Sequence, residues 1–102
     1  MSNSIKKNVN LSIQMIPINT KKAYDGVDAA IAVIQHSGYK HEVQAFSTII
    51  EGPFDELLEL IGRVKSAVFE VDDVKEIIIN LQFHMKKNVD VRFEEKTDKF
   101  KK

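Results

Sequence analysis

The spacing of apolar residues in this chain switches between two periods, and the order of the switches limits the fold more than any other feature. Some segments alternate apolar and polar residues with a period of two, as half-buried strands do. Others repeat apolar residues every three or four positions, as amphipathic helices do. The predicted order is strand, helix, strand, strand, helix, strand, over residues 9–18, 19–38, 39–43, 46–51, 53–68 and 75–85.

The two predicted helices have separate start and stop signals. Asn19 and Thr20 are candidates for the N-cap of the first helix, and Gly38 suits the left-handed residue that ends it. Pro53, directly after Gly52, suits the first position of the second helix. Each helix has one apolar stripe, formed by Ala23, Val27, Ala30, Ile31 and Ile34 in the first and by Leu57, Leu60, Ile61, Val64 and Val68 in the second.

With right-handed crossovers, this order closes into a four-stranded antiparallel sheet with two helices on one face. This is the ferredoxin-like βαββαβ arrangement of the α+β class. The first strand is expected at the centre, between the third and the last. The residues expected to face the helices are Leu11, Ile13, Ile77, Ile79 and Leu81. The uncovered face would carry a polar centre with apolar flanks, formed by Ser12, Gln14, Ile16, Ile78, Asn80 and Gln82.

Two interpretations of the uncovered face stay open. The first is a solvated sheet face, which is normal in antiparallel sheets. The second is a face that packs on another subunit and binds something small at its polar centre. Ile16 and Ile78 favour the second interpretation, because fully solvated faces seldom carry such residues.

The composition predicts a single domain, 1–102, with a core at about 9–84 and a charged C-terminal arm at 86–102. Fifteen basic residues balance fifteen acidic ones, which gives no reason to expect nucleic acid or an anionic membrane as partner. The chain has no cysteine and no apolar run near the roughly 20 residues of a membrane span. We therefore expect a soluble, cytoplasmic protein. Three apolar residues could pin a short helix in the arm: Val91, Phe93 and Phe100.

No pattern in the chain is typical of a catalytic or metal site. The histidines, at positions 36, 41 and 84, lack the spacing of metal ligands, and the serines lack a nucleophile elbow. The four glycines are explained by turns, a cap or helix packing, so no phosphate loop is predicted. Glu51, at the end of a strand, would be a general base, a ligand acceptor or an ordinary strand-end acid. We expect no enzyme activity, no metal and no cofactor.

Three motifs, in matching order and spacing, resemble the small thiamine-binding proteins related to YkoF. They are SIQMIPI at 12–18, VDAAIAVIQHSG at 27–38 and FSTIIEG at 46–52. The resemblance covers about residues 9–84, and the charged stretch from Lys86 onward departs from the pattern. It implies ferredoxin-like subunits that pair through their sheets as homo-oligomers, either dimers or tetrameric dimers of dimers. It also implies non-catalytic binding of thiamine, or of its hydroxymethylpyrimidine moiety, in transport or salvage of the vitamin.

The resemblance also implies a small-ligand site at a subunit interface, because a few polar groups in an apolar cleft are typical of such sites. Glu51 would offset the thiazolium charge. Thr48 and Glu51 fall on opposite faces of an ideal strand. Their joint use would need a bulge, a supporting role for one of them, or a different subunit for each. The ligand-binding residues expected are Ser12, Gln14, Phe46, Ser47, Thr48 and Glu51.

Two other functions stay open. The chain could be a structural or regulatory oligomeric subunit with no small ligand, in which Thr48 and Glu51 form only hydrogen bonds between subunits. It could also be an enzyme that uses Glu51 as a base with a histidine, since the ferredoxin-like fold supports many activities.

Overall fold

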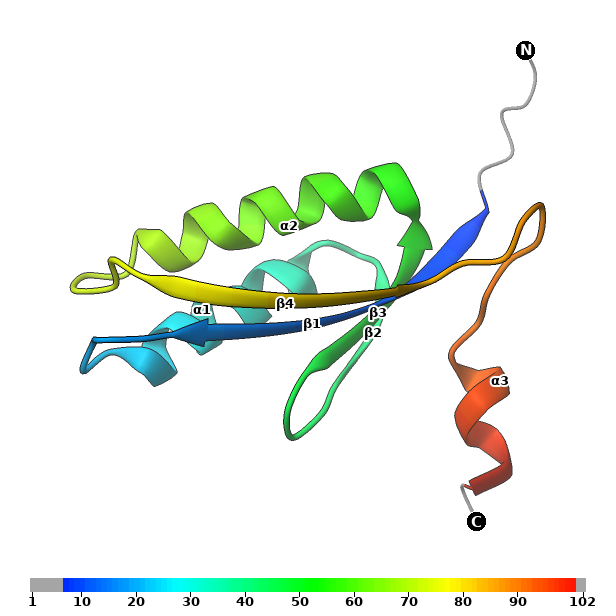
Figure 1. Ribbon diagram of the computed structural model, residues 1–102, viewed down its shortest axis with the longest axis horizontal. Helices are drawn as coiled ribbons and strands as arrows, with labels where there is room; N and C mark the ends of the chain where they lie inside the picture. Colours follow the sequence, from blue (N-terminus) through cyan, green and yellow to red (C-terminus); the bar gives the residue numbers. More distant parts are fainter. Residues whose placement is uncertain (1–6, 101–102) are drawn as a thin grey trace.

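The computed structural model describes residues 7–100 and contains one four-stranded antiparallel sheet. The strands lie in the order β2-β3-β1-β4, so β1 is central, as predicted. The observed α+β architecture confirms the βαββαβ fold (Figure 1). The elements are β1 (Asn8–Pro17), α1 (Ala23–His36), β2 (Lys40–Val43), β3 (Thr48–Pro53), α2 (Phe54–Phe69), β4 (Ile77–His84), α3 (Glu94–Thr97) and the 3₁₀ helix η1 (Asp98–Phe100).

The hydrophobic core lies between the two long helices and one face of the sheet. Alternation along β1 directs Val9, Leu11 and Ile13 into this core, because every second side chain of a strand points to the same face of the sheet. The helical stripes meet them from the other side. Their fully or almost fully buried members are Ala30 and Ile34 of α1 and Leu57, Leu60, Val64 and Val68 of α2. One continuous cluster therefore joins both helices to the same face of the sheet.

The uncovered face has the predicted composition. Three cross-strand pairs of β1 and β4 contribute to it: Ser12 with Gln82, Gln14 with Asn80, and Ile16 with Ile78. Residues directly opposite each other in an antiparallel pair share a face. The Asn80 amide donates a hydrogen bond of 3.1 Å to the Gln14 side-chain oxygen, so the polar centre is internally ordered.

Both helix starts differ from the prediction. Helix α1 begins at Ala23 with Lys22 as its N-cap, and neither Asn19 nor Thr20 caps it. The Thr20 hydroxyl is instead 2.9 Å from the carboxylate of Asp73, in the turn after α2. This hydrogen bond, with one from the Lys21 N–H, lowers the pKa of Asp73. The Thr20 hydroxyl therefore joins two turns that are distant in the sequence, and it does not cap α1 as predicted.

Helix α2 begins at Phe54, and Pro53 is its N-cap rather than its first helical residue. The ψ angle of Pro53 is 139°, because this residue still belongs to the end of β3. The predicted third strand also starts later than expected. Phe46 and Ser47 lie in the hairpin loop, and β3 begins at Thr48. Gly38 has a φ of 85° and fills the left-handed position expected after α1.

The C-terminal arm, residues 86–100 of the described chain, folds onto the uncovered side of the sheet. Figure 1 shows α3 on the side of the sheet opposite to α2, where the β2–β3 hairpin also projects. Val91 and Phe93 are buried, as their predicted anchoring role requires, whereas Phe100 is exposed. The arm and the hairpin thus bound the uncovered face at two of its edges.

Candidate functional site

A cavity of about 270 Å³ opens between β1, α1 and the β2–β3 hairpin. Its walls are mostly apolar, and they include Ile13, Val27 and Ile34. Polar lining comes from the side chains of Gln14, Gln44, Ser47 and Thr48, together with the Tyr24 phenol. An apolar cleft with a few polar groups is the usual form of a small-ligand site.

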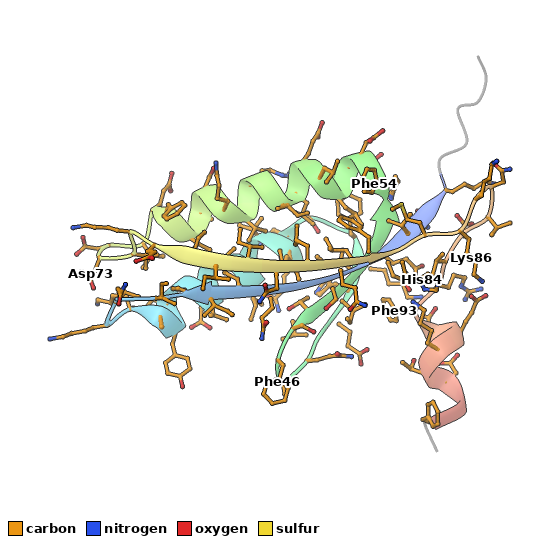
Figure 2. The ribbon with its side chains drawn as sticks, viewed as in Figure 1. Phe46, Phe54, Asp73, His84, Lys86 and Phe93 are labelled. Carbon is orange, nitrogen blue, oxygen red and sulfur yellow. The ribbon has the colours of Figure 1, made fainter. Side chains whose placement is uncertain are left out.

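The hairpin loop shapes the mouth of this cavity. Val43 pairs with Thr48, and the four-residue loop between them is closed by a 2.9 Å hydrogen bond from the Gln44 N–H to the Ser47 carbonyl. Phe46 lies at the tip of the loop, where 84% of it is exposed (Figure 2). Tyr24 of α1 lines the same cavity and is 87% exposed. Two exposed aromatic rings therefore belong to the rim of one apolar cavity.

Thr48 places a hydroxyl group in this cavity. It pairs with Ile13 in the β1–β3 ladder and so points toward the helices, although it is polar and only 6% exposed. Among residues 7–100, no hydrogen bond of its side chain is found, and no fully buried side-chain oxygen or nitrogen lacks a partner. The Thr48 hydroxyl is therefore open to the cavity rather than sealed in the core, and a bound ligand can reach it.

A shallower hollow of about 250 Å³ adjoins the cavity on the uncovered face of the sheet. The two share Gln14, Phe46 and Ser47, and the hollow adds Ser12 from β1. The hairpin loop thus brings together five of the six residues predicted for the ligand site: Ser12, Gln14, Phe46, Ser47 and Thr48.

Glu51 lies apart from these five residues. The β1–β3 register runs without interruption from Asn8–Pro53 to Ile13–Thr48, so no bulge brings Glu51 and Thr48 to the same face. Glu51 faces the arm and is 8% exposed. Its Oε1 accepts hydrogen bonds from the Phe93 N–H at 2.9 Å and the Asn10 amide at 3.4 Å. The structure therefore gives this carboxylate the contacts of an anchor for the arm, and Glu51 lines neither the cavity nor the adjoining hollow.

The docked arm creates a third hollow that the sequence did not reveal. It measures about 480 Å³ and lies between the arm and the uncovered face. On the sheet side it is lined by Ser12, Gln82 and His84, and on the arm side by Phe93 and Lys96. The alternation of Val91 and Phe93 was the sequence signal for a docked arm. Three residues of strand-like pattern are too few to predict where the arm contacts the sheet.

Charged contacts fix the outer edge of the arm. Lys40 of β2 forms an ion pair with Glu94, and its Nζ lies 4.9 Å from the centre of the Phe93 ring. The hydrogen bond from Lys40 lowers the pKa of Glu94. At the other edge, the Asn8 N–H donates to Asp90 at 2.7 Å. The arm is thus held to the sheet at two points, Asp90 and Glu94.

Neither a metal centre nor a membrane span is present in the described part of the chain. Within residues 7–100, no three His, Cys, Asp or Glu side chains are grouped as metal ligands. No helix in the same range combines the length and the apolar character needed to cross a membrane.

The fold and the cavity define a small ferredoxin-like α+β domain with a ligand-sized cleft beside its uncovered sheet face. The chain belongs to the thiamine-binding protein family, whose model matches residues 11–101. The match includes the arm. The resemblance seen in the sequence motifs had stopped at residue 84, because the charged composition of the arm hid its place in the family pattern.

Individual relatives agree with this assignment. The UPF0045 protein of Clostridium perfringens (strain 13 / Type A) is 30% identical over 93 residues, which cover 90% of this chain and 96% of the relative. A domain of unknown function, DUF77, from Bacillus cereus has a similar structure, with a TM-score of 0.88, 34% identity, and coverage of 98% of this chain and 96% of that one. A protein from Thermotoga maritima proposed to act in thiamine biosynthesis or salvage has a TM-score of 0.83, 25% identity, and coverage of 92% and 99%.

Proposed function

We propose that this protein binds thiamine, or its hydroxymethylpyrimidine moiety, without catalysis, in the cavity between α1 and the β2–β3 hairpin. The observation that carries the proposal is the cavity itself, whose mostly apolar walls also carry the Thr48 hydroxyl and the Gln14 and Gln44 amides. Membership of the thiamine-binding family supports the choice of ligand. We further propose a cytoplasmic role in carrying or salvaging the vitamin.

The chemistry of an aminopyrimidine fits this cavity. Its flat ring needs apolar walls, its ring nitrogens need donors, and its exocyclic amine needs an acceptor. Thr48 can donate or accept, and each of Gln14 and Gln44 offers both a carbonyl and an amide group. The volume of about 270 Å³ is slightly below the usual range for drug-sized ligands. It therefore suits one buried ring, with the rest of the ligand on the uncovered face.

The aromatic rim offers a place for the cationic thiazolium ring. A cation over an aromatic face is stabilised by about 0.5–2 kcal/mol, more when water is excluded. Tyr24 and Phe46 are exposed at this rim and have free ring faces to offer. Glu51 was expected to balance this charge, but its contacts with the arm leave that role to the aromatic rings.

Thiamine should raise the melting temperature of the wild-type protein. At about 100 times its Kd, a ligand specific for the folded state adds about 2.7 kcal/mol, which corresponds to an increase of about 10 °C or more in a domain of this size. Thr48→Val keeps the shape but removes the hydroxyl, so thiamine should bind about three- to tenfold more weakly. Ser66→Ala, which removes an exposed hydroxyl from α2, is the matched control.

No increase with thiamine, its phosphates or hydroxymethylpyrimidine would contradict the binding function. If such a protein were still oligomeric, the alternative of a structural or regulatory assembly subunit would be favoured. If thiamine raised the melting temperature of wild type and Thr48→Val equally, the ligand would bind outside this cavity.

We also propose that the subunits pair through their uncovered faces, as a dimer or a dimer of dimers, so that the ligand site lies at the interface. Ile78 is 46% exposed on that face, and Ile16 lies directly opposite it on β1. Phe46 projects on the same side (Figure 2). Burial of such residues against a second sheet would remove apolar area from water.

Sedimentation equilibrium should give a mass of at least twice the 11.6 kDa of one chain. Ile78→Asp should shift the protein toward monomer, because it places a charge in the apolar part of the interface. Phe69→Asp is the matched control, since Phe69 is similarly exposed but belongs to α2 on the far side. A wild-type protein that is monomeric at micromolar concentration would remove the interface from this proposal.

A further inference from the structure

The hollow beneath the arm has a positively charged lining. Its basic side chain is Lys96, and His84 adds an imidazole on the sheet side (Figure 2 labels His84 and Phe93). Hydrogen-bonding groups come from Ser12, Gln44, Gln82 and Thr97. None of the residues that line the hollow is an aspartate or a glutamate. Such a lining favours an anionic group over a neutral or cationic one.

A buried amide holds the Lys96 ammonium in place. Its Nζ donates to the Asn10 Oδ1 at 3.0 Å, and Asn10 is itself buried. The Asn10 side-chain nitrogen is fixed by hydrogen bonds to the Val91 carbonyl at 3.0 Å and to Glu51. An ammonium group has three donors, and this amide uses one of them. The other two can reach a ligand.

The charge of Lys96 is not cancelled by a direct ion pair. Among residues 7–100, Lys96 lies in no ion pair with a carboxylate. Glu51 is separated from it by the Asn10 amide, and Glu94 pairs with Lys40 and Arg92. The arm thus presents a cation to the hollow, while Glu51 and Glu94 are engaged by other partners.

The hollow connects with the proposed thiamine cavity. It shares Ser12 and Gln82 with the shallower hollow on the uncovered face, which in turn shares Gln14 and Phe46 with the cavity. Along β1, the four residue steps from Asn10 to Gln14 span about 13 Å. An extended thiamine phosphate has a comparable length, with the pyrimidine at one end and the phosphate at the other. Free thiamine ends in a neutral hydroxyl, which interacts with a cation more weakly than a phosphate does.

We propose that this hollow is a subsite for the phosphate of a phosphorylated thiamine, and that the protein prefers the phosphate ester to the free vitamin. The inference rests on the proposed function, because the pyrimidine is placed in the cavity beside the hairpin. Lys96 would contact the phosphate oxygens, and Ser12 and Gln82 would donate hydrogen bonds along the connecting track. Charge-assisted contacts of this kind are stronger than those between neutral groups.

Calorimetry with thiamine and thiamine monophosphate tests the subsite. Wild type should bind the monophosphate about tenfold more tightly than thiamine, and Lys96→Met should abolish that preference while leaving thiamine affinity unchanged. Lys96→Arg should retain the preference, because it keeps a cation at the same place. Lys87→Met removes an equal charge from the same arm outside the hollow and should behave like wild type. Melting temperatures show whether each variant keeps its fold.

Three results would overturn the inference. If wild type bound thiamine and its monophosphate equally, the subsite would not exist, although the proposed function would stand. If Lys96→Met weakened both ligands equally, Lys96 would support the arm rather than contact phosphate. If neither ligand bound to wild type, the proposed function itself would fail and the subsite with it.

Discussion

Replacing Leu60 with alanine should lower the free energy of unfolding by about 2–5 kcal/mol. Leu60 is completely buried and lies in the cluster that joins α2 to Leu11 of the central strand. Its truncation removes apolar contacts and leaves a cavity that the surrounding side chains can fill only in part. For a domain whose total stability is about 5–15 kcal/mol, this is a large fraction. Urea unfolding followed by circular dichroism measures the loss.

Leu58 provides the matched control on the same helix. It has the same chemistry but is 44% exposed, so Leu58→Ala should cost less than about 1 kcal/mol. Equal losses at the two positions would mean that α2 does not bury the assigned stripe. A loss below about 1 kcal/mol at Leu60 would contradict its place in the core.

Replacing Glu51 with alanine should destabilise the docked arm by about 1.5–3 kcal/mol, the value of a hydrogen bond to a charged group. The substitution leaves the Phe93 N–H without its acceptor, and it leaves the Asn10 amide with the Val91 carbonyl alone. The amide hydrogen of Phe93 should then exchange with solvent much faster, while amides in the core of β1 stay protected. Hydrogen exchange read by NMR distinguishes this local opening from global unfolding.

Glu95→Ala is the control, because Glu95 is an exposed acid of the same arm. Glu51→Gln should fall between the two, since its carbonyl oxygen can still accept a hydrogen bond from Phe93. Suppose instead that Glu51→Ala left the exchange of Phe93 unchanged and lowered thiamine affinity. Glu51 would then be a ligand acid, as the resemblance in the sequence implied.

The fold could be predicted because its determinants are local. The period of two in β1 already separates Leu11 and Ile13 from Ser12 and Gln14. The order of elements and the right-handed crossover rule then leave few topologies to consider. The composition of the uncovered face followed from the same alternation once the strand order was fixed.

The helix caps were harder to predict because distant contacts decide them. Thr20 has the chemistry of an N-cap, but its hydroxyl binds Asp73, which lies 53 positions away in the sequence. Pro53 has the fixed φ of a first helical residue, yet it also ends a paired strand, and that pairing keeps its ψ extended. Local propensity was overruled by tertiary structure in both places.

The candidate site could be predicted only in part, because contacts between residues distant in the sequence decide it as well. The parity of β3 shows that Thr48 and Glu51 point to opposite faces, but it cannot show what covers each face. Glu51 meets Phe93, 42 positions later, and nothing in the local pattern predicts that contact. The arm gives Glu51 a structural contact in place of a ligand contact. It also supplies Lys96 to a hollow that the sheet alone would lack.

Chemical-shift changes in a two-dimensional NMR titration show directly whether thiamine binds in the cavity between α1 and the hairpin. If thiamine binds between α1 and the hairpin, saturable changes should centre on Gln14, Phe46 and Thr48, with the side-chain amide of Gln14 among them. Residues on the outer side of α2, such as Arg63 and Lys65, should not move and serve as internal controls. The absence of saturable changes at millimolar thiamine, or changes confined to residues remote from the cavity, would show that thiamine does not bind there.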